Sequence, residues 1–350
     1  MRTATAAGTR GSGEGGARSR TLQLPLLADF PASPPPPLGA APSRATTFYA
    51  IQSRSVLNNP AATHMPFWSV NPYIGCEFGC TYCYARDTHR YAVERRGSGE
   101  AGQELPRIPA FPLPRPDPFE TDILVKVNAA ALIPRTLNPE RVGSQPIVIG
   151  TATDPYQPAE RRYRITRGLL ESLLPFRGLH LGIITKSPLI TRDVDVLTRL
   201  AERHLVRIYI SLAALDGRLV RRLEARSPAP HARLRALARL ARAGLDVGLL
   251  AAPIIPGITD GRDQLAALFR AAKEAGARRV SGEALRLGPA ARRHFLPLLA
   301  REFPELAERY ARRYAHRRSA GPDYVAALAR RVDAIRREVG LADREEGEKD

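Results

Sequence analysis

All three cysteines of the chain lie within eight residues, in the order Cys76-x3-Cys80-x2-Cys83. This spacing brings three thiolates around one point without help from distant sequence. Structural zinc and ordinary iron–sulfur clusters take four protein ligands. The fourth ligand is therefore either another group, such as His64 or His89, or a position kept open for chemistry. Three local cysteines do not indicate a disulfide framework, and they fit a reducing cytoplasm better than an oxidising compartment.

The composition is that of a globular protein with a strong positive charge. The chain has 350 residues, of which 44% are hydrophobic and 25% charged, and its net charge is +18. No stretch approaches the roughly 20 apolar residues needed to span a bilayer, so we expect no membrane partner. The charge is carried almost entirely by arginine and favours a DNA or RNA partner, because such side chains neutralise phosphates. A general use of arginine in place of lysine explains the charge equally well.

The chain divides into segments of different character. Residues 1–43 are rich in Gly and Pro and lack apolar periodicity, which predicts a disordered N-terminal extension. Residues 44–288 are expected to form the folded core, with an exposed insertion or long loop at 97–119. Residues 289–340 have helical spacing and are basic, and residues 341–350 form an acidic tail.

Short β-like runs alternate with helical segments through the core. Strands are expected at 67–70, 123–127, 147–149, 179–184, 205–210, 245–250 and 279–281, and helices at 163–174, 193–203, 231–243 and 262–275. Such alternation predicts a parallel sheet with right-handed crossovers. A full or partial β/α barrel and an open doubly wound sheet both satisfy this pattern.

Ligands of parallel α/β folds bind at the carboxyl ends of the strands. In this sequence the cysteine loop follows the first core strand, and polar or Gly/Pro-rich turns follow later strands at 151–158, 185–187, 211–212 and 252–257. We expect these turns to face one rim and to form the functional site there.

The cysteine motif, with Tyr82 directly before the last cysteine, resembles the signature of radical S-adenosylmethionine (SAM) enzymes. The blocks Asn-Pro-Tyr-x-Gly-Cys, Thr-x-Thr-Asp-Pro-Tyr-Gln-Pro, Thr-Lys-Ser and Ala-Pro-Ile-Ile-Pro-Gly-x-x-Asp narrow the resemblance to the spore photoproduct lyase-like branch, also described as DNA repair photolyase-like. The resemblance covers residues 46–290. It implies an α/β fold with a partial (β/α)6 barrel of the TIM type, followed by the C-terminal helical segment.

The resemblance also implies cofactors. In such enzymes three thiolates bind a [4Fe–4S] cluster, and the fourth iron chelates the amino and carboxylate groups of SAM. One electron, delivered by a reductant such as flavodoxin or ferredoxin, cleaves SAM and yields a 5′-deoxyadenosyl radical. The positions implied to bind SAM are Tyr82, Thr153, Asp154, Lys186, Ser211, Pro253 and Pro256. Each has a plainer explanation, such as loop packing, turn formation or a surface charge.

Other positions are candidates for contact with the substrate. Tyr156, Gln157 and Glu160 follow the second core strand and are expected to point toward a substrate mouth as catalytic residues. Glu224 and Arg226 are further candidates, and a surface ion pair explains them equally well.

One departure from the family concerns the substrate. Spore photoproduct lyase uses a further cysteine, in the turn after the second strand, to donate hydrogen to the product radical. The matching residue here is Thr151, whose O–H bond is too strong for that role. A tyrosine such as Tyr84 or Tyr156 would have to replace it. We therefore expect a radical SAM enzyme with an unknown, lyase-like or hydrogen-abstracting reaction. The alternative is a zinc- or cluster-containing nucleic-acid-binding protein that does not cleave SAM.

Overall fold

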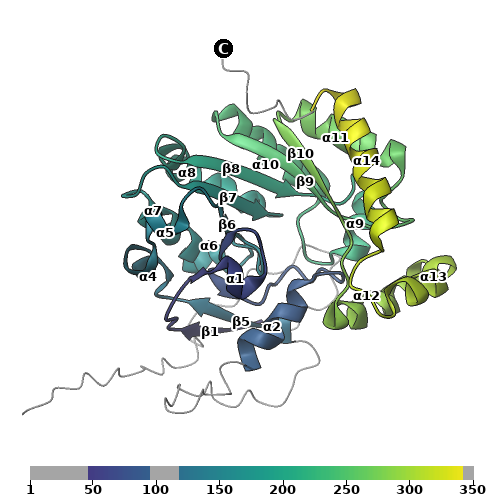
Figure 1. Cartoon of the computed structure of the whole chain (residues 1–350), viewed down its shortest axis with the longest axis horizontal. Helices are drawn as coiled ribbons and strands as arrows, with labels where there is room; N and C mark the ends of the chain where they lie inside the picture. The colour runs from purple at the N-terminus through teal and green to yellow at the C-terminus, as the bar shows by residue number, and fades with distance from the viewer. Residues whose placement is uncertain (1–45, 95–117, 342–350) are drawn as a thin grey trace, which may run out of the picture.

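The computed structural model describes residues 46–94 and 118–341 (Figure 1). The predicted extension at 1–43, residues 97–117 of the predicted insertion and residues 342–350 of the predicted tail lie outside the described residues.

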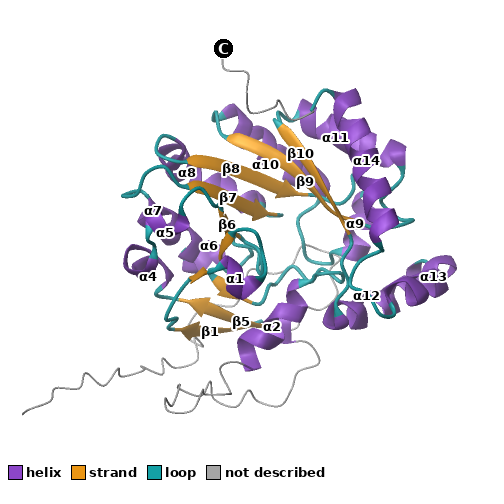
Figure 2. Ribbon diagram, viewed as in Figure 1, coloured by secondary structure: helices purple, strands orange, loops and turns teal. Residues whose placement is uncertain are grey.

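A seven-stranded sheet forms the centre of the fold (Figure 2). In spatial order its strands are β10 (Arg279–Ala284), β9 (Asp246–Ile254), β8 (Leu205–Ser211), β7 (His180–Thr185), β6 (Ile147–Ile149), β3 (Trp68–Val70) and β2 (Leu57–Asn58). The six strands from β10 to β3 are parallel, and only β2 at the edge is antiparallel. From β6 to β10 neighbouring strands follow one another in the sequence, whereas β4 (Tyr73–Ile74) and β5 (Asp122–Lys126) lie between β3 and β6 in the chain and join the other sheet. The large sheet does not close, which confirms the partial (β/α)6 barrel.

Helices cover the sheet. Those between or beside the strands are α4 (Ala129–Thr136), α7 (Ile165–Leu173), α8 (Val194–Ala201), α10 (Pro230–Arg242) and α11 (Arg262–Glu274). The other helices before the C-terminal segment are α1 (Pro60–Thr63), α2 (Ala85–Glu94), α3 (Pro118–Thr121), α5 (Pro139–Val142), α6 (Glu160–Tyr163), η2 (Pro188–Asp193) and α9 (Gly217–Leu223). Every second residue of β7 is buried, and two of these, Leu181 and Ile183, join apolar residues of the helices in one large core. Removal of this apolar surface from water is the main force that holds the layers together.

A second, three-stranded sheet corrects one expectation. The run at 123–127 forms β5 (Asp122–Lys126), which pairs with β1 (Thr47–Ile51) and β4 (Tyr73–Ile74) and takes no part in the large sheet. All five residues of β5 are buried. Its continuous apolar run therefore resembles a central strand of a parallel sheet, and the sequence does not show which sheet it joins.

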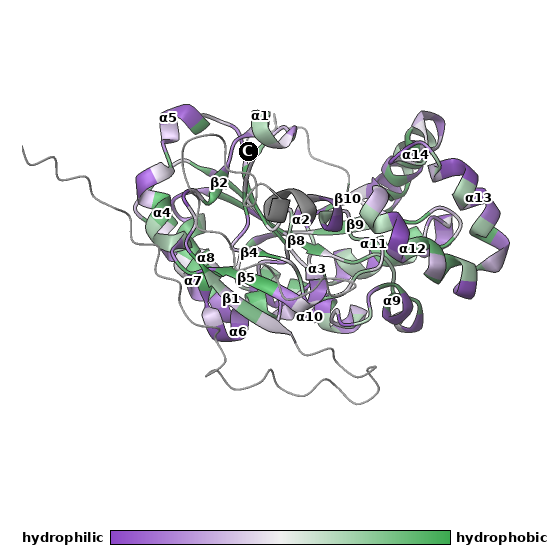
Figure 3. Cartoon of the chain, turned by 90° about the horizontal axis from the view of Figure 1, so that it is seen from below, coloured by the Kyte–Doolittle hydropathy of each residue, from purple (hydrophilic) through white to green (hydrophobic). Residues whose placement is uncertain are grey.

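Three C-terminal helices complete the fold: α12 (Pro289–Glu302), α13 (Pro304–Tyr314) and α14 (Pro322–Val339). Helix α14 packs against α11 and β10, whereas α12 contacts α2 and α13. Phe295, Tyr310 and Tyr314 belong to the same apolar cluster as Cys76 and Cys80. The C-terminal helices therefore cover one side of the cysteine loop, and hydrophilic and hydrophobic residues alternate along their ribbons (Figure 3). No helix of the described segments has the length and apolar character that a bilayer span requires.

Candidate functional site

The cysteine loop begins after β3, at the carboxyl end of the parallel strands. Cys76 and Cys80 are buried, and Cys83 is half-buried. Gly75 has φ +87°, and a Cβ atom at this position would lie 2.9 Å from the carbonyl oxygen of Phe119. A left-handed backbone and this close approach both require glycine. The shape of the loop therefore requires the glycine that directly precedes Cys76.

The turn after β6 is bonded to this loop. Thr153 Oγ1 donates to the carbonyl oxygen of Gly75 at 2.6 Å, and Gln157 Nε2 donates to the same oxygen at 3.2 Å. Gln157 Oε1 accepts from the backbone N–H of Glu77 at 3.0 Å. The Glu77 carboxylate in turn accepts from the N–H of Ala159 at 2.7 Å. These four hydrogen bonds, all buried, fix the cysteine loop to the second core strand.

The segment that follows α9 holds the loop from the other side. The N–H of Thr81 donates to the Leu223 carbonyl at 3.0 Å, and the N–H of Arg226 donates to the Phe78 carbonyl at 3.2 Å. The Arg226 side chain, one of the two further candidates, forms an ion pair with Glu120 at 2.6 Å. This ion pair is half-buried and braces the loop rather than lying free on the surface.

Three of the residues predicted to bind the cofactor meet around one carboxylate. Lys186 Nζ donates to Ser211 Oγ at 2.8 Å and lies 3.4 Å from Glu224 Oε1. The Tyr82 hydroxyl donates to the same Glu224 oxygen, and Lys186 Nζ lies 5.8 Å from the centre of the Tyr82 ring. Residues from four different segments, which lie up to 142 positions apart in Tyr82 and Glu224, therefore converge beside the cysteine loop.

The charge of Glu224 is held in a site with no solvent contact. Its other oxygen accepts from Ser227 Oγ at 2.5 Å and from the guanidinium of Arg233, and the Arg233 side chain is completely buried. Burial alone would raise the pKa of Glu224, but the positive charges of Arg233 and Lys186 keep that pKa well below its usual range. Arg233 also donates to the Ser211 carbonyl at 2.9 Å. Arg233 is not among the residues predicted from the sequence.

Asp154 joins the second and third core strands. Its Oδ1 accepts from Thr185 Oγ1 at 2.6 Å and from the N–H of Tyr156 at 2.9 Å, and its Oδ2 accepts from the N–H of Lys186 at 2.7 Å. Burial raises the pKa of Asp154, while these hydrogen bonds lower it in part. Asp154 therefore sets the backbone from which the Lys186 side chain extends.

The end of β9 lies beside Ser211. Ser211 Oγ donates to the carbonyl of Ala252 at 3.2 Å. Ser211 therefore links the Lys186 side chain to the last residues of β9. Pro253 is half-buried and Pro256 is buried. The Pro256 carbonyl accepts from the Tyr310 hydroxyl at 2.6 Å, which attaches this wall to α13.

The residues predicted to be catalytic do not line an opening. Tyr156, Gln157 and Glu160 all have 0% of their surface exposed, contrary to the expectation that they point toward a substrate mouth. Glu160 forms an ion pair with Arg192 at 2.9 Å and accepts from the N–H of Thr166 at 2.9 Å. Glu160 therefore secures the turn after β6, as Gln157 secures the cysteine loop.

The two tyrosines considered as hydrogen donors differ in position. Tyr156 is fully buried, whereas Tyr84 is 44% exposed and directly follows Cys83. The Tyr84 hydroxyl donates to the backbone carbonyl of Thr151. Asn71 Nδ2 donates to Thr151 Oγ1 at 3.1 Å. Of the two, Tyr84 is the one at the cysteine loop and accessible.

The three thiols are the candidate ligands of a metal centre. Among residues 46–94 and 118–341, the side chains of His, Cys, Asp and Glu form no group of three that is arranged to hold a metal ion. Burial raises the pKa of all three thiols, and the charges of Cys76 and Cys83 raise that of Cys80 further. A bound cationic centre removes this cost, because it stabilises the thiolates. The three cysteines therefore fit an iron–sulfur cluster with one site left for another ligand.

Comparison with known proteins identifies the family. The Radical SAM superfamily matches residues 70–269, from the last residue of β3 to α11. The chain belongs to the radical SAM superfamily of enzymes. An uncharacterized protein of Mycobacterium bovis is 34% identical over 288 residues, which cover 82% of this chain and 79% of that protein. An uncharacterized protein of Methanocaldococcus jannaschii is 25% identical over 202 residues, covering 58% of this chain and 66% of that protein.

The same radical SAM fold occurs in solved structures of spore photoproduct lyase. A tyrosine-to-phenylalanine variant of that enzyme matches with a TM-score of 0.60 at 15% identity, covering 84% of this chain and 80% of that chain. A double variant with bound AdoMet and dinucleoside spore photoproduct matches with a TM-score of 0.57 at 16% identity, covering 83% and 79% of the two chains.

Proposed function

We propose that Cys76, Cys80 and Cys83 hold a [4Fe–4S] cluster and that SAM binds at its open iron. The cluster supplies one electron for the reductive cleavage of SAM to a 5′-deoxyadenosyl radical, and a protein such as flavodoxin or ferredoxin reduces it. The observation that carries this proposal is the placement of three thiols, without a fourth, at the strand ends next to Lys186. A protein site that lacks one ligand keeps a position for substrate or cofactor. The oxygen-sensitive thiols favour a cytoplasmic location.

Lys186 and Ser211 are the groups suited to the SAM carboxylate. The Lys186 ammonium carries three donors, and in this structure its contacts are the Ser211 hydroxyl and the Glu224 carboxylate. A carboxylate that enters beside Lys186 gains a charge-assisted hydrogen bond. Tyr82 provides an aromatic ring at the same place, held by its bond to Glu224.

The surroundings of the loop limit the access of water. Cys76, Cys80 and Tyr82 lie in one apolar cluster with residues of α12 and α13. A low dielectric strengthens the electrostatic contacts inside the site and protects a reactive radical from side reactions. The C-terminal helices, together with the segment after β9 that contains Pro256, therefore shield the cysteine loop from water.

The substrate is proposed only as a class. The net charge of +18 favours a nucleic-acid-related substrate. Direct reversal of a thymine dimer by the lyase route lacks a thiol donor, because all three cysteines are assigned to the cluster. Tyr84 is exposed and lies next to Cys83 in the sequence. It is therefore the residue suited to donate a hydrogen atom in place of the thiol.

Anaerobic turnover tests the proposal. The protein is reconstituted with iron and sulfide and incubated with SAM and dithionite, and 5′-deoxyadenosine is measured by mass spectrometry. Formation of 5′-deoxyadenosine by cluster-containing protein supports the proposal, and its absence refutes it. Deuterated candidate substrates, including ultraviolet-damaged DNA, then show which hydrogen is abstracted. A nucleic-acid-binding protein without SAM cleavage would bind DNA with a steep salt dependence and form no 5′-deoxyadenosine.

A further inference from the structure

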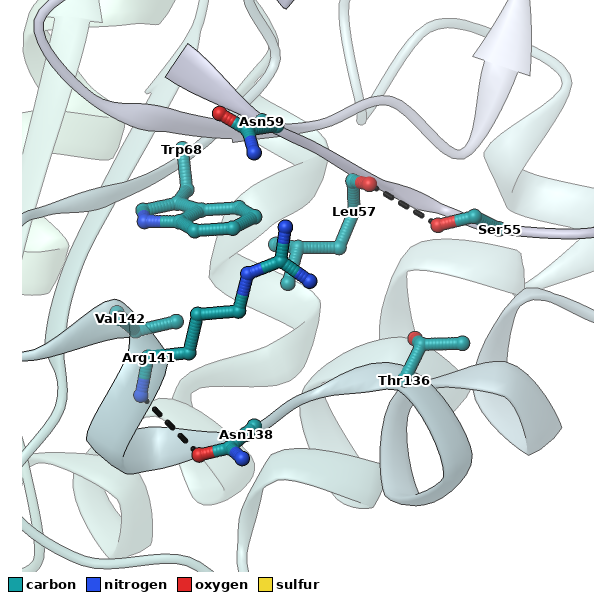
Figure 4. Close-up of a pocket in the computed structure, with 8 residues that line it drawn as sticks. All are labelled: Ser55, Leu57, Asn59, Trp68, Thr136, Asn138, Arg141 and Val142. Carbon is teal, nitrogen blue, oxygen red and sulfur yellow. Dashed lines mark hydrogen bonds between the residues drawn. The ribbon is translucent and has the colours of Figure 1, made fainter. Parts of the chain in front are cut away.

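A cavity of about 330 Å³ lies between the β2–β3 edge of the large sheet and helices α4 and α5 (Figure 4). Trp68, the first residue of β3, forms part of its wall, whereas the cysteine loop follows the last residue of that strand. The opposite wall comes from the end of α4 and from α5. Its volume is at the lower end of the roughly 300–1,000 Å³ that small-molecule sites occupy. None of the roles proposed for the cysteine loop involves this cavity.

The single charge of the cavity is the guanidinium of Arg141. It lies over the ring of Trp68, 5.5 Å from the ring centre, and points into the space between the walls (Figure 4). Arg141 forms no ion pair within the described segments, and no Asp or Glu lines the cavity. Contact with Trp68 restricts the orientation of the guanidinium plane while leaving its N–H groups available.

Two asparagines add further donors. Asn59 Oδ1 accepts from the N–H of Ala61 at 2.9 Å, and Asn138 Oδ1 accepts from the N–H of Arg141 at 3.1 Å. Because a backbone N–H requires an oxygen acceptor, these bonds determine which end of each amide is oxygen. Both NH2 groups make no hydrogen bond to a described residue. With Arg141 they provide more donors than the two oxygens of a carboxylate can use.

The remaining polar groups of the cavity are hydroxyls. Ser55 Oγ donates to the carbonyl of Leu57 at 3.0 Å, and Thr136 Oγ1 donates to the carbonyl of Leu132 at 2.8 Å. Their protons are used, so each oxygen presents lone pairs that accept from a ligand hydroxyl. The cavity therefore matches a ligand with several anionic oxygens at one end and hydroxyl groups at the other.

We propose that this cavity binds a small phosphorylated compound of the sugar phosphate or mononucleotide class. The phosphate meets Arg141 and the amide groups of Asn59 and Asn138, and the ligand hydroxyls meet Ser55 and Thr136. Arginine suits this role because its planar fork matches the geometry of phosphate oxygens.

Trp68 is the only tryptophan of the chain, so its fluorescence reports on this cavity alone. The full-length protein is titrated with ribose 5-phosphate and with AMP, and the emission of Trp68 is followed. Calorimetry on the same samples gives the stoichiometry. We expect a saturable change with at least one of the two phosphorylated compounds, with one ligand per chain, and no change with ribose or adenosine.

Two variants test the donors. Arg141→Gln should weaken binding at least about tenfold, because it removes charge-assisted hydrogen bonds. Asn138→Asp keeps the helix cap, since Asp caps as well as Asn, but places a negative charge in the cavity and should also weaken binding. The matched control is Arg135→Gln, which removes the same charge from an exposed arginine of α4 outside the cavity and should leave binding unchanged.

Three results would overturn the proposal. The first is the absence of saturable binding of either compound. Arg141 would then serve only to pack against the ring of Trp68. The second is equal affinity in Arg141→Gln and the unaltered chain. The third is binding of a DNA or RNA oligonucleotide without binding of AMP or ribose 5-phosphate, because this would indicate a nucleic-acid surface rather than a small-molecule site. None of these measurements requires the cluster, so they do not depend on the radical chemistry.

Discussion

The carboxylate of Glu224 pairs with the guanidinium of Arg233, and neither side chain has any surface exposed to solvent. Glu224 also accepts from Tyr82 and lies 3.4 Å from Lys186 Nζ. Two buried or half-buried cations therefore share one anion, which leaves one positive charge beside the cysteine loop. That excess suits a ligand carboxylate, and Arg233 keeps Glu224 ionised so that it can position Lys186 and Tyr82.

The first prediction concerns the stability of this ion pair. Glu224→Ala should lower the free energy of unfolding by about 3–5 kcal/mol, because it leaves the charge of Arg233 buried without a partner. Urea denaturation of the apoprotein measures this loss. Replacement of both residues by apolar ones should cost less than the sum of the single changes. The exposed Arg312–Glu308 pair is the control, since Glu308→Ala should change the midpoint little. A small loss in Glu224→Ala would contradict the buried-pair argument.

The second prediction separates cofactor binding from cluster binding. Lys186→Ala should retain iron and sulfide at normal levels but bind SAM about ten- to a hundredfold more weakly, as expected for a lost charge-assisted contact. Calorimetry with SAM on the reconstituted protein measures the affinity. Lys273→Ala, which alters a lysine bonded to the Val339 carbonyl far from the loop, is the control. Unchanged SAM affinity in Lys186→Ala would show that Lys186 is misplaced in the proposed site.

The third prediction concerns the metal centre. Cys80→Ala should lose most of the iron and the brown absorbance after anaerobic reconstitution, because two thiolates do not retain a four-iron cluster. His89→Ala should keep both, since the His89 ring packs edge-on against Phe119 with 5.5 Å between the ring centres. Measurement of iron, sulfide and zinc in both variants distinguishes an iron–sulfur cluster from a zinc site. A colourless protein with one zinc ion that is lost in His89→Ala would support the zinc alternative.

Much of this architecture follows from the sequence. The alternation of strands and helices predicts a parallel sheet, and the resemblance to radical SAM enzymes adds the partial (β/α)6 barrel. The rule that ligands bind at strand ends places the cysteines, Lys186 and Ser211 on one rim. The assignment of 123–127 to the same sheet is wrong, because its apolar residues show that the strand is buried but not which strands flank it. Pairing between distant strands depends on the whole chain.

The interior of the site was less predictable. Polar residues after a strand look the same whether they face a ligand or brace a loop, and Gln157 and Glu160 do the latter. Arg233 is marked in the sequence by its helical spacing, although it is not among the predicted site residues. It has the same helical spacing, i, i+3, i+4 and i+7, as the buried residues Ala236, Leu237 and Leu240 of α10. An arginine in an apolar stripe indicates a buried ion pair, although its partner Glu224 cannot be read from spacing.

The fourth prediction concerns pH. His204 Nδ1 accepts from the N–H of Leu179 at 3.2 Å, and Nε2 contacts the carbonyl of Leu173 at 3.2 Å. Burial lowers the pKa of His204, and a protonated ring could not accept the Leu179 N–H. In the unfolded chain the His204 ring takes up a proton near the pKa of a free histidine, about 6.5. In the folded chain the ring takes up this proton only at lower pH. Stability from His204 is therefore present above about pH 6.5 and is lost as the pH falls toward the folded-state pKa.

His204→Gln tests this dependence. Urea midpoints at several values between pH 5 and pH 7.5, a range chosen around the free histidine value of about 6.5, should fall less steeply in the variant than in the unaltered chain. His316→Gln changes an exposed histidine of the C-terminal region and should keep the original slope. Equal slopes in all three proteins would show that His204 does not contribute to the pH dependence.

The fifth prediction concerns the turn that carries Thr151. Gly150 has φ +98°, and an added Cβ would lie 2.5 Å from the Ile184 carbonyl oxygen and 2.7 Å from Pro155 Cδ. Gly178 also has a positive φ, +71°, but an added Cβ meets nothing within 4 Å. Gly178→Ala therefore introduces backbone strain alone, on the order of 1 kcal/mol, whereas Gly150→Ala adds a clash with backbone that cannot move freely.

Thermal unfolding of the two alanine variants should consequently separate these effects. We expect a clearly larger drop in the midpoint for Gly150→Ala than for Gly178→Ala. Because Gly150 joins β6 to the turn that bonds the cysteine loop, its variant should also incorporate less iron on reconstitution. Equal midpoints would mean that the Ile184 carbonyl and Pro155 yield to the added methyl group, and that the second core strand is less rigid than its hydrogen bonds to β3 and β7 indicate.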